Sequence, residues 1–302
     1  MNKRIAIIDL GTNSLITIIA EMLNDEIKIV NENYQIIRLG EGIAETGNIS
    51  NNAILRCISS FQRIKKKLKK YKVEKIICVA TSALRDALNG KKIIQLLQNK
   101  FKINIQIIDG KTEAKIVANA TKREFNIKNK NIVIFDIGGG STELIILQNN
   151  IIKVIDSFKI GAVRCTESFL KSDPPKMAEI KKFENYLDEK LLKFSNFNVV
   201  EGIGIAGTVT TLSSINLKLE KYNSDFIHKS NITISEVEAI KNKIQNINLL
   251  QRKTIKGLDP KRAEVILSGT IICKKIMEKF KLNKIIVSDR GLRWGLLYQE
   301  FD

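Results

Sequence analysis

The sequence contains few of the residues that most often carry enzyme chemistry. It has one histidine, His228, so any acid–base chemistry is expected to use carboxylates. This histidine lies in the polar stretch SDFIHKSN and is interpreted as a surface or structural residue. The four cysteines lie far apart without a C-x-x-C pair, which argues against a zinc site or a disulfide framework and fits a reducing cytoplasm. No apolar run reaches the roughly 18 residues of a membrane span, so no membrane association is expected.

Acidic residues are also scarce relative to basic ones. The chain has 50 lysines and arginines against 32 aspartates and glutamates, a net charge of +18, which favours polyanionic partners. A group of lysines falls late in a helix expected from Ser50 to about Tyr71, and we interpret it as the solvated face of that helix. The group comprises Lys65, Lys66, Lys67, Lys69, Lys70 and Lys72. No zinc finger, basic aromatic stripe or RNA-binding motif accompanies it, so dedicated nucleic-acid binding is not expected.

One short pattern occurs twice in the chain. Residues 5–20 (IAIIDLGTNSLITIIA) and 132–147 (IVIFDIGGGSTELIIL) align without a gap at an offset of 127 positions, with identity at seven of 16. In each copy an apolar run ends in an aspartate, Asp9 or Asp136, and a turn with glycine and serine leads into a second apolar run. The pattern predicts a strand-turn-strand hairpin. A hairpin without function is the alternative for either copy alone, but repetition of the D-x-G-x-x-S spacing favours a functional device.

The residues of these turns suit phosphate binding. Glycines at Gly11 and Gly138 to Gly140 permit positive φ and let backbone N–H groups approach an anion closely. The aspartate beside each turn can hold a hydrated divalent cation on the phosphate. Two such turns facing each other across a cleft would hold a phosphate chain from both sides.

Length and pattern predict two mixed α/β domains. The first is expected over residues 1–122, completed by 289–302, and the second over 123–288. Strands are expected successively within 3–33 and at 75–80, 105–109, 132–147, 151–158, 200–206 and 284–288. Helices are expected at 50–71, 177–193, 235–247 and 261–280, directly after 206, and at the C-terminus.

Six motifs occur in a fixed order along the chain: DLGTNS from Asp9, ATSALRDA from Ala80, DGKTEA from Asp109, DIGGGSTE from Asp136, GIAGT from Gly204 and SDRGLRWG from Ser288. Together they resemble the exopolyphosphatase/guanosine pentaphosphate phosphohydrolase (Ppx/GppA) family over essentially the whole chain. DIGGGSTE and the Thr-Ser-x-x-Arg segment from Thr81 to Arg85 are the most specific parts. The sequence ends after its C-terminal helix and so resembles the short form of the family, without C-terminal helical domains.

The resemblance implies a fold and an activity. It implies a two-domain, actin-like fold of the sugar kinase, heat-shock chaperone and actin superfamily, with the active site in the interdomain cleft. It also implies removal of terminal phosphate from inorganic polyphosphate or from guanosine pentaphosphate, which becomes the tetraphosphate, with Mg²⁺ or another divalent cation. A cytoplasmic location is expected, and a homodimer is compatible with the sequence.

Site residues follow from the motifs that match. Glu113, at a strand end and a helix start, corresponds to the family's catalytic glutamate and is the candidate base that orients water; an acidic residue favouring a helix N-terminus is the alternative. Asp136 and Glu143 are assigned to the metal and to water, with Asp9 as a third metal candidate. Arg85 resembles the family's phosphate-clamping arginine. An arginine suits this role because its planar guanidinium can donate hydrogen bonds to two phosphate oxygens at once. The remaining phosphate-binding candidates are Gly11, Thr12, Asn13, Ser14, Thr81, Ser82, Gly138, Gly139, Gly140, Ser141, Gly207 and Thr208.

The chain departs from the family pattern at two positions. Ile16 stands where many relatives have arginine or another polar residue, and Ala206 replaces the first glycine of Gly-Gly-Thr. Both departures bear on substrate choice, for which polyphosphate is ranked before guanosine pentaphosphate. Two other functions stay open: a small-molecule kinase of the same fold, and a non-catalytic regulator that binds polyphosphate or guanosine alarmones.

Overall fold

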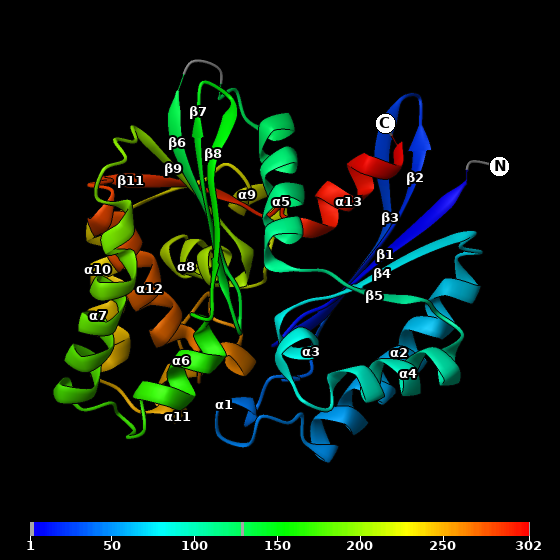
Figure 1. Cartoon of the computed structure of the whole chain (residues 1–302), viewed down its shortest axis with the longest axis horizontal. Coiled ribbons are helices and arrows are strands. Elements are labelled where there is room, and N and C mark those ends of the chain that lie inside the picture. The colour runs from blue at the N-terminus through cyan, green and yellow to red at the C-terminus, as the bar shows by residue number, and fades with distance from the viewer. Residues whose placement is uncertain (1–2, 128–129, 302) are drawn as a thin grey trace. The chain divides into compact units, whose positions relative to one another are not determined.

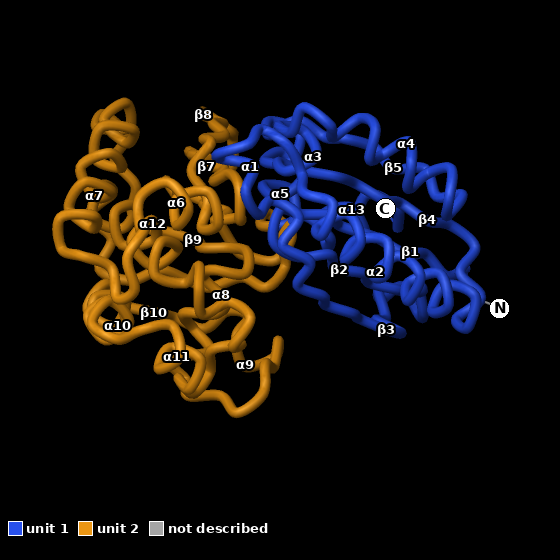
Figure 2. Tube along the Cα trace, turned by 90° about the horizontal axis from the view of Figure 1, so that it is seen from below, with its two compact units in different colours: residues 1–120, 292–302 blue, residues 121–291 orange. Residues whose placement is uncertain are grey.

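The computed structural model of the protein describes residues 3–127 and 130–301. The chain divides into two compact units, coloured separately in Figure 2. Unit 1 comprises residues 1–120 and 292–302, and unit 2 comprises residues 121–291. Each unit has its own sheet and its own buried apolar core, so each is described by itself.

Unit 1 is built on a five-stranded sheet with the order β3-β2-β1-β4-β5 (Figure 1). Its strands are β1 (Arg4–Leu10), β2 (Ser14–Leu23), β3 (Glu26–Ile36), β4 (Lys75–Ala80) and β5 (Ile105–Ile107). The first three are the successive strands predicted from the sequence, and they pair as an antiparallel meander to which β4 and β5 add in parallel. The observed strand β5 is shorter than the strand predicted at 105–109, because Ile108 and Asp109 already lead into the next helix.

The helices of unit 1 are α1 (Ile43–Thr46), α2 (Asn51–Lys70), α3 (Ser82–Asp86), α4 (Gly90–Phe101), α5 (Gly110–Glu124, which passes into unit 2) and α13 (Leu292–Phe301). As predicted, Ser50 caps α2, where its hydroxyl accepts a hydrogen bond from the Ala53 N–H. One face of α2 is buried in the core, and the lysines occupy the other side. Among them Lys67 contacts the side chains of Asn31 and Asn33 on β3.

Unit 2 contains a six-stranded sheet with the order β10-β11-β9-β6-β7-β8. Its strands are β6 (Asn131–Ile137), β7 (Thr142–Gln148), β8 (Ile151–Phe158), β9 (Glu201–Ile205), β10 (Asn231–Thr233) and β11 (Lys284–Ser288). Here β6, β9 and β11 run parallel, so their carboxyl ends lie at one edge of the sheet. The predicted turn at Asn149 and Asn150 is confirmed, with both residues at positive φ. The short edge strand β10 was not predicted.

The helices of unit 2 are α6 (Ala162–Phe169), α7 (Met177–Leu191), η1 (Leu192–Phe194), α8 (Ala206–Asn216), α9 (Ser224–Ile227), α10 (Ile234–Gln245), α11 (Leu249–Arg252), η2 (Pro260–Arg262) and α12 (Ile266–Lys279). Most of α12 is buried, and it packs against α6, α7, α8 and α10. The prediction of one helix over 261–280 was wrong at its start. Asp259 caps a separate short helix at Pro260, and α12 begins only at Ile266.

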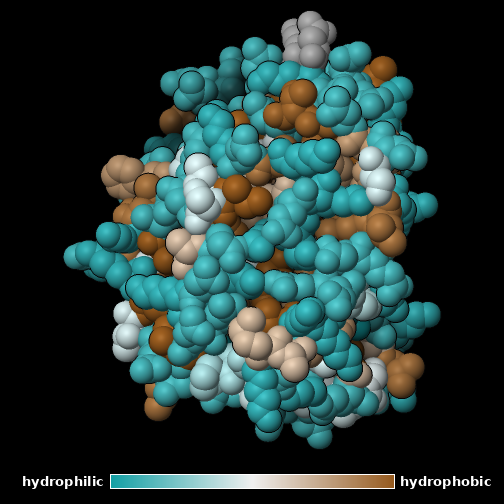
Figure 3. Space-filling view, turned by 90° about the vertical axis from the view of Figure 1, so that its left-hand side faces the viewer, coloured by the Kyte–Doolittle hydropathy of each residue, from teal (hydrophilic) through white to brown (hydrophobic). Residues whose placement is uncertain are grey.

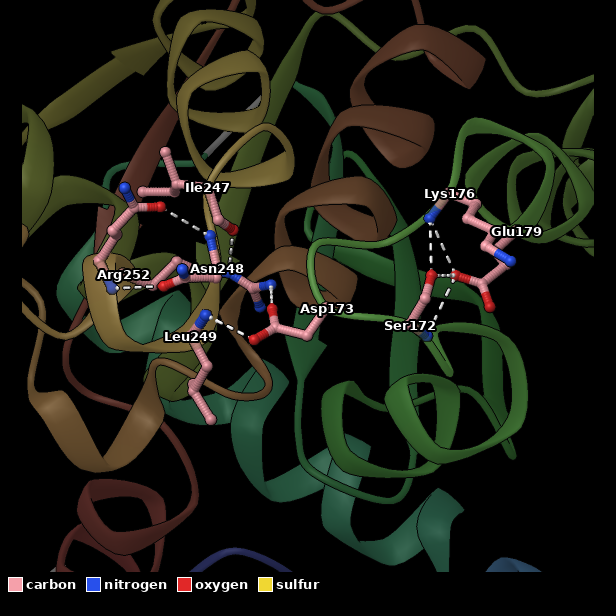
Figure 4. Close-up of polar contacts among 9 residues, drawn as sticks. Ser172, Asp173, Lys176, Glu179, Ile247, Asn248, Leu249 and Arg252 are labelled. Atoms are coloured by element: carbon pink, nitrogen blue, oxygen red, sulfur yellow. Dashed lines mark hydrogen bonds and ion pairs between the residues drawn. The ribbon is translucent and has the colours of Figure 1, made fainter.

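A buried arginine fixes the loops around α7 and α11 (Figure 4). The side chain of Arg252 is 5% exposed and pairs with Asp173 at 2.5 Å, while the Leu249 N–H donates to the same carboxylate. Burial lowers the pKa of Arg252 and the charge of Asp173 raises it. Because an unpaired buried cation is costly, this pair ties the segment before α7 to α11.

Figure 3 shows one side of the molecule, where hydrophilic atoms predominate and hydrophobic atoms appear in small separate groups. Single exposed apolar side chains such as Met177, Leu192 and Leu250 are ordinary for a globular chain. In residues 3–127 and 130–301 no helix is both long and apolar enough to span a membrane.

Candidate functional site

The two predicted hairpins are confirmed and have the same turn. In unit 1 the turn joins β1 to β2, and the Gly11 N–H donates to the Ser14 carbonyl at 3.0 Å. In unit 2 the turn joins β6 to β7, and the Gly138 N–H donates to the Ser141 carbonyl, also at 3.0 Å. The sequence repeat is therefore a repeat of backbone geometry.

Each turn is braced through its carbonyl groups. In unit 1 the Thr12 carbonyl accepts from the Gly40 N–H, and the Asn13 carbonyl accepts from two further N–H groups. In unit 2 the first N–H groups of α6 donate to the carbonyls of Gly138 and Gly139. Added support comes from Arg164, whose Nε donates to the Gly140 carbonyl. The bracing carbonyls thus point toward the protein.

The N–H groups of the same turns stay available for a ligand. Within the described residues, the backbone N–H groups of Thr12, Asn13, Gly139 and Gly140 have no acceptor. The side-chain Nδ2 of Asn13 is also buried without a partner in that part of the chain. Consecutive N–H groups of this kind form a concavity that suits a phosphate oxygen.

The hairpin of unit 2 carries two buried carboxylates side by side. Asp136 on β6 lies directly opposite Glu143 on β7 in the antiparallel register, so both side chains are on one face of the sheet. Asp136 is 9% exposed and Glu143 is 1% exposed. The Ser157 hydroxyl on β8 donates to Glu143 Oε1 at 2.7 Å. This pair was predicted from the sequence as a metal-binding and water-orienting pair.

The hairpin of unit 1 has only one of these carboxylates. There the residue opposite Asp9 is Ile16, in the position that Glu143 occupies in unit 2. Burial raises the pKa of Asp9 to about 6, and the positive charge of Arg293 on α13 opposes that shift. Arg293 also pairs with Glu32 on β3 at 3.1 Å. Sequence reasoning quoted Arg293 within a motif but did not place it near Asp9, because α13 and β1 are at opposite ends of the chain.

Glu113 and Arg85 lie together in unit 1. Glu113 is in the first turn of α5 and is 9% exposed, and its Oε2 is 3.4 Å from the Nη1 of Arg85 on α3. The same arginine nitrogen donates to the Ile108 carbonyl at 2.9 Å. The loop that enters α3 places Thr81 and Ser82 next to this arginine, and both are buried. The structure thus brings the predicted base and the predicted phosphate clamp into contact.

The N-terminus of α8 is the second predicted anion site of unit 2. Ala206 has φ +68°, in the left-handed region that favours glycine. The guanidinium of Arg262 lies directly over Gly207, because a Cβ added there would be 2.1 to 2.5 Å from its atoms. Thr208 packs against Gly269 and is buried.

Arg262 was missed in the sequence analysis. No motif surrounds it, and 54 positions separate it from Thr208. Its proximity to the anion loop arises from the placement of η2 against α8.

A divalent cation is compatible with these residues. Within the described residues no group of three or more histidines, cysteines, aspartates or glutamates is close enough to form a metal cage. Mg²⁺ commonly needs only one or two protein carboxylates, with waters and substrate phosphates as the other ligands. Asp136 and Glu143 fit that requirement.

Each unit thus combines a glycine turn with buried carboxylates and an arginine, and sequence comparison identifies the family of the chain. A profile of the Ppx/GppA phosphatase family matches residues 18–302. The chain belongs to this family. The confirmed resemblance also establishes it as an enzyme of the phosphohydrolase type.

Relatives of this Ppx/GppA protein differ in length. A bifunctional 3-dehydroquinate synthase/phosphatase of Fusobacterium nucleatum is 37% identical over 97% of this chain, but the chain spans only 46% of that protein. An exopolyphosphatase 2 of Mycobacterium tuberculosis is 28% identical, with 97% of both chains covered. A guanosine-5'-triphosphate,3'-diphosphate pyrophosphatase of Aliivibrio fischeri is 27% identical and covers all of this chain, which spans 60% of it.

Solved structures agree with the family and the predicted fold class. An exopolyphosphatase from Cytophaga hutchinsonii has a TM-score of 0.93 at 26% identity, covering 99% of this chain and 98% of that one. A Ppx/GppA family member from Aquifex aeolicus has a TM-score of 0.82 at 30% identity, with 99% and 98% covered. The mixed α/β class with two sheets and duplicated hairpins is therefore confirmed.

Proposed function

We propose that this chain is a magnesium-dependent hydrolase that releases orthophosphate from the end of inorganic polyphosphate. Guanosine pentaphosphate, converted to the tetraphosphate, is its second substrate. The observation that carries the proposal is the pair of equivalent turns, each with two backbone N–H groups that lack an acceptor within the described residues. The names of the mycobacterial and Aliivibrio relatives support both substrates.

Each side chain has a role in this proposal. Glu113 accepts a proton from the attacking water or orients it, and Arg85 holds two oxygens of the terminal phosphate. The N–H groups of the two turns and the N-terminus of α8 stabilise negative charge on the phosphate oxygens. Arg262 adds a guanidinium beside the α8 loop.

Asp136 and Glu143 hold the cation, with Asp9 as a further candidate. A bound Mg²⁺ would neutralise part of the charge that develops on the phosphate oxygens. The two carboxylates of unit 2 lie opposite each other on neighbouring strands, which supports this role. Ile16 removes the equivalent second carboxylate from unit 1, so we assign the main metal ligands to unit 2.

The proposal is tested by measuring phosphate release from polyphosphate, guanosine pentaphosphate and ATP, with and without Mg²⁺. We expect turnover of the first two substrates that stops when EDTA removes the metal. Asp136→Asn should raise the Mg²⁺ concentration needed for half-maximal rate, whereas the exposed-surface variant Leu250→Ala should leave it unchanged. Binding of polyphosphate without any phosphate release would instead favour a regulator, and transfer to an acceptor would favour a kinase.

A further inference from the structure

A short loop of unit 2 exposes two aromatic side chains. Tyr222 is 55% exposed and Phe226 on α9 is 65% exposed, although the sequence is only 6% aromatic. Among the described residues, the ring of Phe226 has no aromatic or cationic partner. Figure 2 shows α9 on a loop at the margin of unit 2. An exposed ring without a partner is available to a ligand.

The loop is held rigidly in spite of its exposure. Ile227, the neighbour of Phe226, is fully buried in the core of unit 2, so the two side chains point in opposite directions. The Tyr222 hydroxyl donates to Asp289 Oδ1 at 2.5 Å, and the Ser224 hydroxyl donates to Oδ2 of the same carboxylate at 2.8 Å. The backbone that carries Phe226 is anchored in this way by its neighbours, so little backbone conformational entropy is lost when a ligand binds to its ring.

Asp289 connects the aromatic loop to the phosphate-binding edge of the sheet. It follows Ser288, the last residue of β11. Ser288 is in register with Ile205 on the neighbouring strand β9. Ile205 is in turn in register with Asp136 on β6. With strands about 4.8 Å apart, the Cα atoms of Ser288 and Asp136 are about 10 Å apart. The segment that follows Asp289 then approaches Asp136, since a Cβ at Gly291 would be 3.6 Å from Asp136 Oδ2.

We propose that Phe226, with Tyr222 beside it, stacks against the base of a purine nucleoside polyphosphate. The phosphate chain of that ligand would extend along the carboxyl edge of β11 and β9 to the turn at Gly138 to Gly140. Ligands of parallel sheets commonly bind outside the carboxyl ends of the strands, which is where this loop and this turn both lie. The inference rests on the proposed function, because it uses the same phosphate-binding turn.

The chemistry of the loop favours a nucleotide over a protein partner. Exposed lysines at Lys218, Lys221 and Lys229 flank the two rings in sequence, and the carboxylates of Glu220, Asp225 and Asp289 balance their charge. The rings, and not the charge, therefore favour a nucleotide. Two rings separated by three polar residues provide far less apolar area than the about 800 Å² per partner of a stable protein interface. One aromatic ring is enough for one base.

The test compares two ligands that carry three phosphates each, GTP and inorganic tripolyphosphate. Their binding in the presence of Mg²⁺ is measured by calorimetry for the wild-type chain and for Phe226→Ala, Phe226→Tyr and Leu250→Ala. We expect Phe226→Ala to weaken GTP binding about tenfold, the usual scale for loss of one stacked base. Tripolyphosphate binding should not change, Phe226→Tyr should retain GTP affinity, and the matched exposed residue Leu250 should have no effect on either ligand.

The outcomes separate this inference from the proposed function. If Phe226→Ala binds GTP as tightly as the wild type, or loses affinity for both ligands equally, the stacking site is wrong while phosphate release from polyphosphate can still occur. If GTP binding depends on Phe226 but no substrate is hydrolysed, the stacking site holds and the proposed hydrolase activity is wrong. If the wild type binds tripolyphosphate but not GTP, or binds neither ligand, the stacking site is wrong, and phosphate release from polyphosphate decides the proposed function separately.

Discussion

Glu113, Asp136 and Glu143 are acidic side chains that the fold has removed from most of the solvent. Each retains a polar neighbour: Arg85 for Glu113, Ser157 for Glu143, and Glu143 itself beside Asp136. Buried carboxylates are costly unless they bind something or accept hydrogen bonds. Their position at the ends of strands and at a helix start is consistent with chemistry rather than with stability.

Glu113→Gln tests the proposed base. The amide keeps the size of the side chain but cannot accept a proton, so kcat for polyphosphate should fall by about 10² to 10⁴. Folding should be preserved because the amide oxygen can still accept a hydrogen bond from Arg85, and circular dichroism checks this. Turnover close to that of the wild type would remove Glu113 from the mechanism.

Asp9→Asn tests how burial affects stability. Because burial raises the pKa of Asp9 to about 6 in the folded chain, from 3.8 when exposed, its ionisation destabilises the fold as pH rises from about 4 through 6. The variant cannot ionise there, so its stability relative to the wild type should increase over this range and then level off. The free energy of unfolding of the variant minus that of the wild type should be about 2 kcal/mol larger at pH 8 than at pH 4.

The measurement is urea unfolding across this pH range in EDTA, so that no metal contributes. Glu45→Gln, at an exposed acidic residue of the same unit, is the matched control and should show no such trend. A difference between Asp9→Asn and wild type that is independent of pH would contradict the assigned cause.

At the scale of elements, the N-terminus of α8 combines a proposed anion site with backbone strain. Ala206 is the residue that departs from the Gly-Gly-Thr pattern, and the structure places it at φ +68°. A residue with a Cβ in this left-handed region destabilises the fold by roughly 1 kcal/mol relative to glycine, and such strain is often retained at functional loops. The departure that appeared to concern only substrate choice therefore also concerns local stability.

Ala206→Gly should raise the free energy of unfolding by about 1 kcal/mol, because glycine adopts positive φ without steric cost. As a control, Ala239→Gly lies in the exposed interior of α10, where glycine should lower stability by a similar amount. Chemical denaturation of both variants gives the comparison. If Ala206→Gly is destabilising as well, the strain assigned to this loop is absent in solution.

At the scale of the whole molecule, the excess of basic residues should affect substrates of different charge differently. If a bound polyphosphate chain contacts many of these lysines and arginines, its KM should rise steeply with salt, as in counterion release from nucleic acids. Guanosine pentaphosphate carries fewer charges, and its KM should rise less. Steady-state kinetics for both substrates between low and physiological salt give the two slopes, and equal slopes would mean that only a few phosphates are bound locally.

Hairpins, capping and repeats could be read from the sequence because they are local. The D-x-G-x-x-S repeat, the Ser50 cap and the Asn149–Asn150 turn each depend on residues close in the chain, and the structure confirms them. The two-sheet α/β class also followed from the order of apolar segments. The break between η2 and α12 was missed, because an apolar helical pattern does not show where a cap such as Asp259 interrupts it.

The sequence by itself therefore determined the family, the duplicated turns and the identities of the candidate carboxylates, since motifs with fixed spacing act through the local backbone. Only the tertiary structure decided which of these residues meet. It placed Arg85 against Glu113, Arg262 over Gly207, and Arg293 near Asp9. These contacts join segments that are 28 to nearly 300 positions apart, and their formation depends on how sheets and helices pack, which no local pattern encodes.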